Sequence, residues 1–235
     1  MVTACAAQRD DCQIVAGVDI RTEQTADFPV FSIPAACTVP VDVIIDFSHP
    51  LSLSGVLDYA TAHHIPAVIA TTGLSEEQQA AIRTAASVTP VFSSANMSLG
   101  VSLLTELAKK AAEVLGTSFD IEIIEKHHNQ KIDAPSGTAL LLAESVKDGL
   151  SYTPRYVFDR QSVREKRDPH DIGISSVRGG TIVGEHEVIF AGHDEYITLS
   201  HTALSREIFA VGALNAAAFT VKQPNGYYTM KDLIG

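Results

Sequence analysis

One short segment gathers most of the residues whose chemistry suits proton transfer. Residues 125–138 hold a glutamate, two adjacent histidines, two lysines and an aspartate, followed by a Pro-Ser-Gly-Thr turn. Imidazole titrates near neutral pH, and a lysine ammonium is a compact charge that attracts anions. The Pro-Ser-Gly-Thr turn is typical of a helix start, whose N–H groups bind anions. The combination suits a carboxylated substrate that has to receive a proton.

Adjacent histidines also have simpler explanations. Most such pairs are solvated or structural, and the chain has a second pair at His63 and His64. Zinc binding is a further alternative, but neighbouring residues rarely face one ion, and no Cys or third His lies nearby at ligand spacing. We therefore expect no metal at His127 and His128.

The first half of the chain alternates strand-like and helix-like segments. Short Val- and Ile-rich runs at 13–19, 41–47, 66–72 and 89–94 have the composition of buried parallel strands. Helices are expected at 52–63 and from Ser75, where Ser75 and Gln78 form a capping-box pattern. This alternation predicts an α/β fold with a doubly wound parallel sheet.

The pattern changes after residue 98. Apolar residues at helical spacing over 104–115 predict a long amphipathic helix, and a strand at 119–126 precedes the charged segment. A helix at about 136–147 is followed by expected strands near 155–159, 172–178, 182–191 and 195–201. The turn at 192–194 predicts an antiparallel hairpin, so this second, α+β part should contain a mixed sheet.

An Ala-rich helix at about 204–220 and the tail are expected to return to the first domain. The predicted domains are therefore 1–98 with 206–235, and 99–205.

Composition excludes several classes of function. The formal net charge is -11, which argues against a nucleic-acid partner, and no run of about eighteen apolar residues predicts a membrane span. The first residues have neither a basic region nor a continuous apolar one, so no secretory signal is expected. Cys5, Cys12 and Cys37 are odd in number and lack paired spacing, which indicates free thiols and a cytoplasmic location.

The string E-x-H-H-x-x-K-x-D-A-P-S-G-T-A over 125–139 resembles the signature of the dihydrodipicolinate reductase family, also called 4-hydroxy-tetrahydrodipicolinate reductases. The likeness covers nearly the whole chain and includes DVIIDFSHP, IATTGLSEEQ and VFSSANMSLGV. It implies a Rossmann-like dinucleotide-binding domain and a second domain that binds substrate and forms homotetramers. The implied reaction is the NADH- or NADPH-dependent reduction of a dicarboxylate in diaminopimelate and lysine biosynthesis.

The resemblance also implies which residues transfer protons. The first histidine of the pair, His127, is the expected acid/base residue, and Lys131 is its partner acid. We expect Glu125 and Asp133 to order the loop rather than react.

Three further residues match family positions that hold the substrate carboxylates. They are His128, Gly137 and Thr138. A glycine at a helix start agrees with this role, because the backbone there can approach a carboxylate closely.

The cofactor residues are expected at the ends of successive strands. Asp19 ends the run 13–19, where an acidic side chain can bind ribose hydroxyls and disfavour a 2′-phosphate, which favours NADH. Arg21 could contact a 2′-phosphate and leaves NADPH open. Family likeness implies cofactor contacts from segments at the strand ends, where open α/β sheets bind ligands. These residues are Phe47, Ser48, Ala70, Thr71, Thr72, Ser94, Ala95, Asn96 and Met97.

One family feature does not occur in this sequence. Family members begin with a strand and a G-x-x-G-x-M-G turn, whereas the first glycine here is Gly17. That strand is central in the order 3-2-1-4-5-6, so its neighbours would lack a pairing partner. We expect these elements to lie upstream of Met1, in some twenty further residues. Alternatively, the chain is a non-catalytic relative that binds a dicarboxylate or serves in oligomer assembly.

Overall fold

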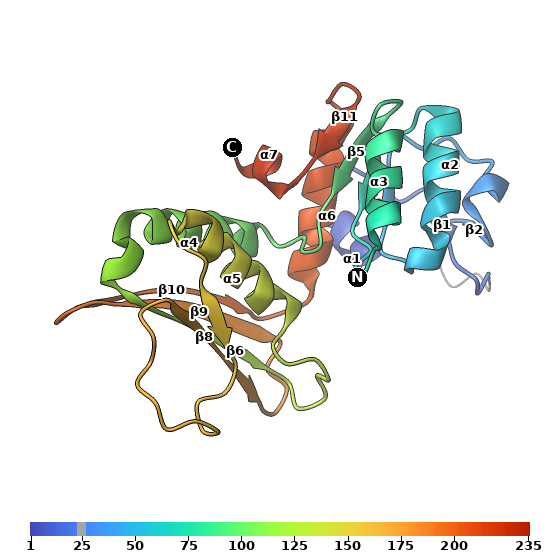
Figure 1. Cartoon of the computed structure of the whole chain (residues 1–235). Coiled ribbons are helices and arrows are strands. Elements are labelled where there is room, and N and C mark those ends of the chain that lie inside the picture. The colour runs from blue at the N-terminus through green and yellow to red at the C-terminus, as the bar shows by residue number, and fades with distance from the viewer. Residues whose placement is uncertain (23–26) are drawn as a thin grey trace. The chain divides into compact units, whose positions relative to one another are not determined.

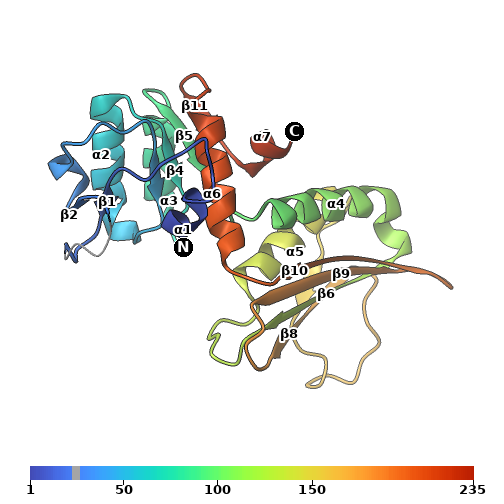
Figure 2. The same cartoon turned by 180° about the vertical axis from the view of Figure 1, so that it is seen from behind.

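The computed structural model describes residues 1–22 and 27–235, which form two compact units. Unit 1 comprises Met1–Leu99 and Glu207–Gly235, and unit 2 comprises Gly100–Arg206. Figures 1 and 2 show the elements of each unit from opposite sides.

Unit 1 is built on a four-stranded parallel sheet of order β11-β5-β4-β3. Its strands are β3 (Ile44–Asp46), β4 (Ala67–Ile69), β5 (Pro90–Ser93) and β11 (Gly226–Tyr228). Helices α2 (Leu53–His63) and α3 (Glu76–Ala85) cover one face, and α6 (Glu207–Thr220) and α7 (Met230–Ile234) cover the other (Figure 1). The prediction of a doubly wound sheet is confirmed.

Strand alternation divides the apolar side chains of this sheet between two cores. Ile69 and Val91 pack with α2 and α3, whereas Val68 and Phe92 pack with α6. Both faces are therefore buried, which explains why the strands read as continuous apolar runs. The predicted capping box of α3 is present, because the Ser75 side chain accepts from Gln78 N and the Gln78 side chain accepts from Ser75 N.

The amino-terminal strands form a separate sheet. Strand β1 (Gly17–Val18) pairs in parallel with β2 (Val30–Phe31), and α1 (Val2–Ala6) packs against α6. The run 13–19 was predicted to be a buried strand, but only two of its residues pair, and Val18 is 49% exposed. Within the described residues β1 pairs with β2 alone, and the pairing covers two residues of each strand. Strand β3 is an edge strand of the four-stranded sheet.

Unit 2 is built on a five-stranded mixed sheet of order β10-β9-β6-β8-β7. Its strands are β6 (Asp120–His127), β7 (Arg155–Val157), β8 (Asp171–Arg178), β9 (Gly184–Ala191) and β10 (Tyr196–Ala203). Helices α4 (Leu99–Leu115) and α5 (Gly137–Gly149) pack on one face (Figure 2). Strands β9 and β10 form the predicted antiparallel hairpin, and β6 pairs in parallel with β8, so the mixed sheet is confirmed.

Three short 3₁₀ helices complete the described structure. They are η1 (Pro34–Ala36), η2 (Pro50–Ser52) and η3 (Gly116–Ser118).

A close backbone approach in unit 1 requires glycine at position 212, in α6. A Cβ there would lie 1.7 Å from the carbonyl oxygen of Met97, so backbone would have to move. We predict that Gly212→Ala lowers the free energy of unfolding by about 3 kcal/mol or more, at the upper end of overpacking costs. Urea unfolding followed by circular dichroism measures the change.

The matched control is Gly55→Ala in α2, where no atom of the described residues beyond the chain neighbours and the helix's own backbone lies within 4 Å of the new Cβ. Alanine in a helix interior should stabilise the protein by about 0.5–1 kcal/mol. Equal effects of the two variants would contradict the close approach.

Candidate functional site

The carboxyl end of β6 lies in the middle of the five-stranded sheet, between β8 and β9. Strand pairing places Glu125 opposite Ser176 and His186, and it places His127 opposite Arg178. Because residues two apart in a strand share a face, Glu125 and His127 both lie on the side covered by α4 and α5.

The Glu125 carboxylate is fully buried and accepts hydrogen bonds from its own strand and from two other segments of the chain. Arg178 donates from both terminal nitrogens, at 2.8 and 2.7 Å. His127 Nδ1 lies 2.6 Å from Oε2, and the backbone N–H of Ser136 donates to Oε1 at 3.1 Å. A single carboxylate thus joins the ends of β6 and β8 to the residue before α5.

The hydrogen bonds decide the ionisation state of Glu125. Burial alone would raise the pKa of this carboxyl group, but the bonds from Arg178 and His127 outweigh it and lower the pKa from 4.5 to about 2. Glu125 is therefore negatively charged at neutral pH.

His127 is the last residue of β6 and is only 9% exposed. Its ring packs edge to face against His186, with the centroids 5.1 Å apart. On the Nε2 side it lies beside Gly184, where a Cβ would come within 3.1 Å of Nε2. Glu125, His186 and Gly184 thus hold the imidazole on three sides.

Helix α5 starts against this cluster. Ser136 is its N-cap, as predicted, and its Oγ accepts from Ala139 N at 3.2 Å and lies 3.0 Å from His186 Nε2. Burial, aided by His127, lowers the pKa of His186 to about 4, so this imidazole is neutral at pH 7. Apart from its chain neighbours and the backbone of its own helix, no atom of the described residues lies within 4 Å of the position of a Cβ on Gly137, the first helical residue. The start of α5 can therefore be approached closely by a ligand.

The loop between β6 and α5 is held by ion pairs. Lys131 Nζ lies 2.8 and 2.9 Å from the two carboxylate oxygens of Asp133, and this bond lowers the pKa of Asp133. Arg178 also donates to the carbonyl oxygen of Asp133 at 2.7 Å. Thr138, the second helical residue, is half-buried. The loop that carries Lys131 is thus tied to the same arginine that binds Glu125.

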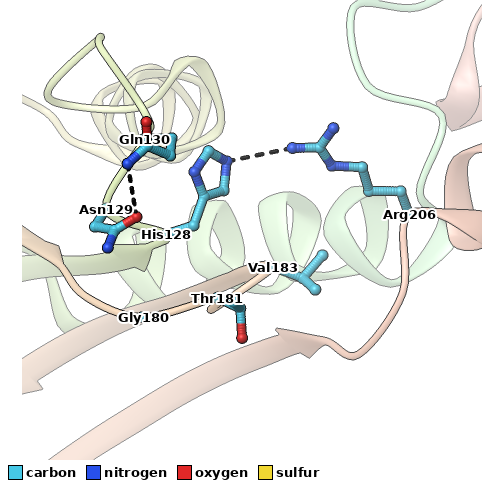
Figure 3. A pocket seen from close by; sticks show the side chains of 7 residues that line it. All are labelled: His128, Asn129, Gln130, Gly180, Thr181, Val183 and Arg206. Atoms are coloured by element: carbon cyan, nitrogen blue, oxygen red, sulfur yellow. Dashed lines mark hydrogen bonds between the residues drawn. The ribbon is translucent and has the colours of Figure 1, made fainter.

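His128 lies in a cavity of about 300 Å³ (Figure 3). Its Nε2 lies 3.2 Å from a terminal nitrogen of Arg206, whose guanidinium points toward the imidazole. The Gln130 amide donates to the Asn129 side chain at 3.1 Å. The lining contains no acidic side chain and consists of His128, Asn129, Gln130, Gly180, Thr181, Val183 and Arg206. We call this space the His128 cavity; it is suited to an anion.

In unit 1, the ends of β3 and β4 are joined by a buried carboxylate. Asp46 accepts hydrogen bonds from the backbone N–H and the hydroxyl of Ser48, and from the Thr71 hydroxyl at 2.8 Å. The backbone N–H of Ala70 donates to the Asp46 carbonyl oxygen at 2.8 Å. Phe47 is 45% exposed and Thr72 is exposed. The two predicted cofactor segments therefore lie side by side at one sheet edge.

The third cofactor segment follows β5. The Ser94 hydroxyl donates to the Asn96 carbonyl oxygen at 2.7 Å, and the Ser94 backbone N–H donates to the Ile69 carbonyl oxygen at 3.2 Å, next to the other two segments. Ala95 is exposed, whereas the Met97 side chain belongs to the core formed with Val68 and Phe92. Only the backbone of Met97 is therefore available for a ligand.

Asp19 follows β1 in the other sheet of unit 1 and is exposed. Its carboxylate accepts from the Arg21 backbone N–H at 2.7 Å. The carboxylate stays accessible to a ligand. Its role toward ribose remains a prediction.

Four residues of these clusters were not identified from the sequence: Asp46, Arg178, His186 and Arg206. Each lies outside the charged segment 125–138, and three of them contact it through strand pairing or across the His128 cavity. For Asp46 and Arg178, a charged residue at the carboxyl end of an apolar strand was the signal that could have indicated them.

Several features of the described chain bear on other functions. No helix within 1–22 and 27–235 is both long and apolar enough to cross a membrane. In the same residues, no group of three or more His, Cys, Asp or Glu side chains could hold a metal ion. Cys5, Cys12 and Cys37 are free thiols, as predicted.

Two family models match the chain. The model described as dihydrodipicolinate reductase, N-terminus matches residues 1–97, and that described as dihydrodipicolinate reductase, C-terminus matches residues 100–234. The 4-hydroxy-tetrahydrodipicolinate reductase of Caldanaerobacter subterraneus is 50% identical over 234 residues, which cover 100% of this chain and 92% of the relative. The enzyme of the same name from Clostridium tetani is 47% identical over 230 residues, 98% of this chain and 90% of the relative.

A solved structure has the same fold. The dipicolinate-bound dihydrodipicolinate reductase from Paenisporosarcina sp. TG-14 superposes with a TM-score of 0.80 over 97% of this chain and 92% of that one. The two sequences are 23% identical. The likeness therefore extends to both units.

The Arg178–Glu125 pair should dominate the pH dependence of stability in unit 2. We predict that Arg178→Gln costs about 3 kcal/mol or more at pH 7, because it leaves a buried carboxylate short of donors. The depressed pKa of Glu125 stabilises the wild type above the usual value of 4.5, and this contribution is lost as the pH falls toward about 2. In the variant Glu125 protonates more readily. The difference in free energy of unfolding between the wild type and Arg178→Gln should therefore become smaller below pH 4.5. Urea unfolding at several pH values tests both points.

Lys147→Gln serves as the control, because it removes an exposed ion pair with Glu144 on α5. It should leave the free energy of unfolding nearly unchanged at every pH, because solvent screens an exposed ion pair. A loss of unfolding free energy in Arg178→Gln that does not change with pH would contradict the prediction.

Proposed function

The chain belongs to the dihydrodipicolinate reductase family, and from this premise we propose that it reduces 4-hydroxy-tetrahydrodipicolinate to tetrahydrodipicolinate with NADH or NADPH. The reaction adds a hydride and a proton and releases water, and it would serve diaminopimelate and lysine biosynthesis. The observation that carries the proposal is the cluster at the end of β6. There an imidazole bound to a buried carboxylate lies beside the start of a helix.

His127 would act as the acid/base residue and Lys131 as its partner acid. The imidazole is held by Glu125 and packed against His186, so it is oriented before any substrate arrives. Lys131 is an ammonium with a side chain 20% exposed, on the loop that connects the imidazole to α5. A proton carrier at the end of β6 and a second one on the loop that follows would suit a reduction that adds a proton and releases water.

The substrate carboxylates would bind at His128, Gly137 and Thr138. The start of α5 offers N–H groups and a partial positive charge, and the bare Cα of Gly137 permits close approach. Arg206 lies 3.2 Å from His128 in the His128 cavity and adds a fixed positive charge to the same region. This arrangement supports a small dicarboxylate as the ligand.

Unit 1 would hold the dinucleotide. The donor set fits such a ligand, because Asp19 is an exposed carboxylate suited to ribose hydroxyls and Phe47 is an exposed ring suited to stacking. Backbone and hydroxyl groups at the strand ends could bind its polar parts, from the set Ser48, Ala70, Thr71, Thr72, Ser94, Ala95, Asn96 and Met97. When bound, the reduced nicotinamide supplies the hydride.

The remaining assignments concern the whole protein. We place cofactor binding in residues 1–98 and 206–235, and substrate binding and oligomerisation in 99–205. Val177 and Tyr196 are exposed on the sheet face of unit 2 that α4 and α5 leave open, which supports a homotetramer assembled through that face. Three free thiols support a cytoplasmic location.

The first test of the function is the turnover of 4-hydroxy-tetrahydrodipicolinate, followed by the loss of nicotinamide absorbance. We predict that His127→Ala and Lys131→Ala each lower kcat on the order of 100-fold or more, because each removes a proton carrier. NADH affinity, measured by nicotinamide fluorescence in a chain that has no Trp, should change little.

Thr138→Val is the comparison variant. It should mainly raise KM, because it alters a carboxylate contact that is present before and during the reaction. A loss of NADH affinity in the His127 or Lys131 variants would place these residues in the wrong site, and an unchanged KM in Thr138→Val would remove Thr138 from the carboxylate site.

Asp19 should set the choice between the two nicotinamide cofactors. We predict that Asp19→Asn weakens NADH binding and improves NADPH binding relative to it, because the charge that repels a 2′-phosphate is removed. Fluorescence titrations with both cofactors measure the ratio of the two Kd values. An unchanged ratio would show that Asp19 does not contact the adenosine ribose.

The same titrations also test the non-catalytic alternative. Dicarboxylate binding by the wild-type chain without binding of either cofactor would favour it.

A further inference from the structure

We propose that Glu125 is the positioning residue of His127: it holds the proton on Nδ1, so that Nε2 is the nitrogen that exchanges a proton during the reaction. The inference rests on the proposed function for its catalytic meaning, but the protonation pattern itself can be measured without substrate.

A short hydrogen bond joins the Glu125 and His127 side chains. His127 Nδ1 lies 2.6 Å from Glu125 Oε2, and both residues are buried. An ionised carboxylate can only accept hydrogen bonds. Nδ1 must therefore carry a proton in both the neutral and the charged imidazole, which leaves Nε2 as the site that gains and loses one.

Hydrogen bonds to both oxygens prevent the Glu125 carboxylate from rotating away from His127. Arg178 binds both of its oxygens, at 2.8 and 2.7 Å, in the bidentate geometry that fixes a carboxylate plane. The backbone N–H of Ser136 donates to Oε1 as well, at 3.1 Å. Glu125 therefore presents one oxygen to the imidazole at a fixed angle, and the ring inherits that orientation.

The Nε2 side of the His127 ring lies beside Gly184. Nε2 faces Gly184, where a side chain would come within 3.1 Å of it, so glycine keeps this edge clear. The charged or titratable groups that contact the ring or its carboxylate partner are Glu125 on β6, Arg178 on β8 and His186 on β9. Of these three, Glu125 is the hydrogen-bond acceptor within reach of His127 Nδ1.

The first experiment uses the wild-type chain. Proton–nitrogen correlation spectra of protein containing isotope-labelled histidine show which ring nitrogen is protonated, and His127→Gln assigns the signal. We expect His127 in its neutral form to be protonated at Nδ1. A neutral His127 protonated at Nε2 would overturn the proposal.

The second experiment tests the consequence for catalysis. Glu125→Gln keeps the size of the side chain, but its amide can no longer fix the proton on Nδ1. We expect kcat to fall on the order of 100-fold or more with little change in KM. The Nδ1 proton signal of neutral His127 should be lost in the same correlation spectra, because no carboxylate holds that proton any longer. Unchanged kcat and an unchanged Nδ1 proton signal in a folded variant would overturn the proposal.

Glu122→Gln is the matched control. Glu122 lies three residues earlier on the same strand and on the opposite face, where it pairs with Arg160. The same substitution there should leave kcat and the Nδ1 proton signal of His127 as in the wild type. If the wild-type chain reduces no dicarboxylate but shows the Nδ1 proton, and Glu125→Gln loses it, the proposed function fails while the assignment of Glu125 stands.

Discussion

The site in unit 2 depends on one buried negative charge. A carboxylate removed from water costs several kcal/mol unless its oxygens are matched by donors, and Glu125 is matched by Arg178, His127 and Ser136. These donors come from β8, from the end of β6 and from the residue that caps α5. The chain can satisfy Glu125 only when all three segments are in place, so the ion network also fixes the imidazole relative to the helix start.

Strand geometry explains why two adjacent histidines have different surroundings. Successive residues of a strand point to opposite sides. His127 still belongs to β6 and faces the buried network, whereas His128 is the first residue beyond the strand and lies in the His128 cavity beside Arg206. An ordered, nearly buried imidazole is suited to proton transfer, and an accessible one is suited to binding. The two histidines of one sequence pair therefore have surroundings that suit different roles.

Local patterns predicted what depends on local structure. The Ser75 and Ser136 caps, the β9–β10 hairpin and the alternation that gives the parallel sheet all follow from residues close together in sequence. Arg178 could not be found in this way, because it meets Glu125 across 53 residues of chain through the parallel pairing of β6 with β8. The length of the strand predicted at 13–19 was overestimated for a related reason, because the length of a strand depends on the strands with which it pairs. The roles of the cofactor residues stay predictions.

The net charge of the chain does not decide the sign of its ligand. The sequence carries a formal charge of -11, yet the acidic residues nearest the site are already paired, Glu125 with Arg178 and Asp133 with Lys131. The His128 cavity has no acidic lining and contains Arg206. Since the field near a ligand is set by the charges and helix ends within a few ångströms, an anion meets a locally positive surface there. The excess negative charge elsewhere is screened by salt over about 10 Å, so it weakens this attraction little.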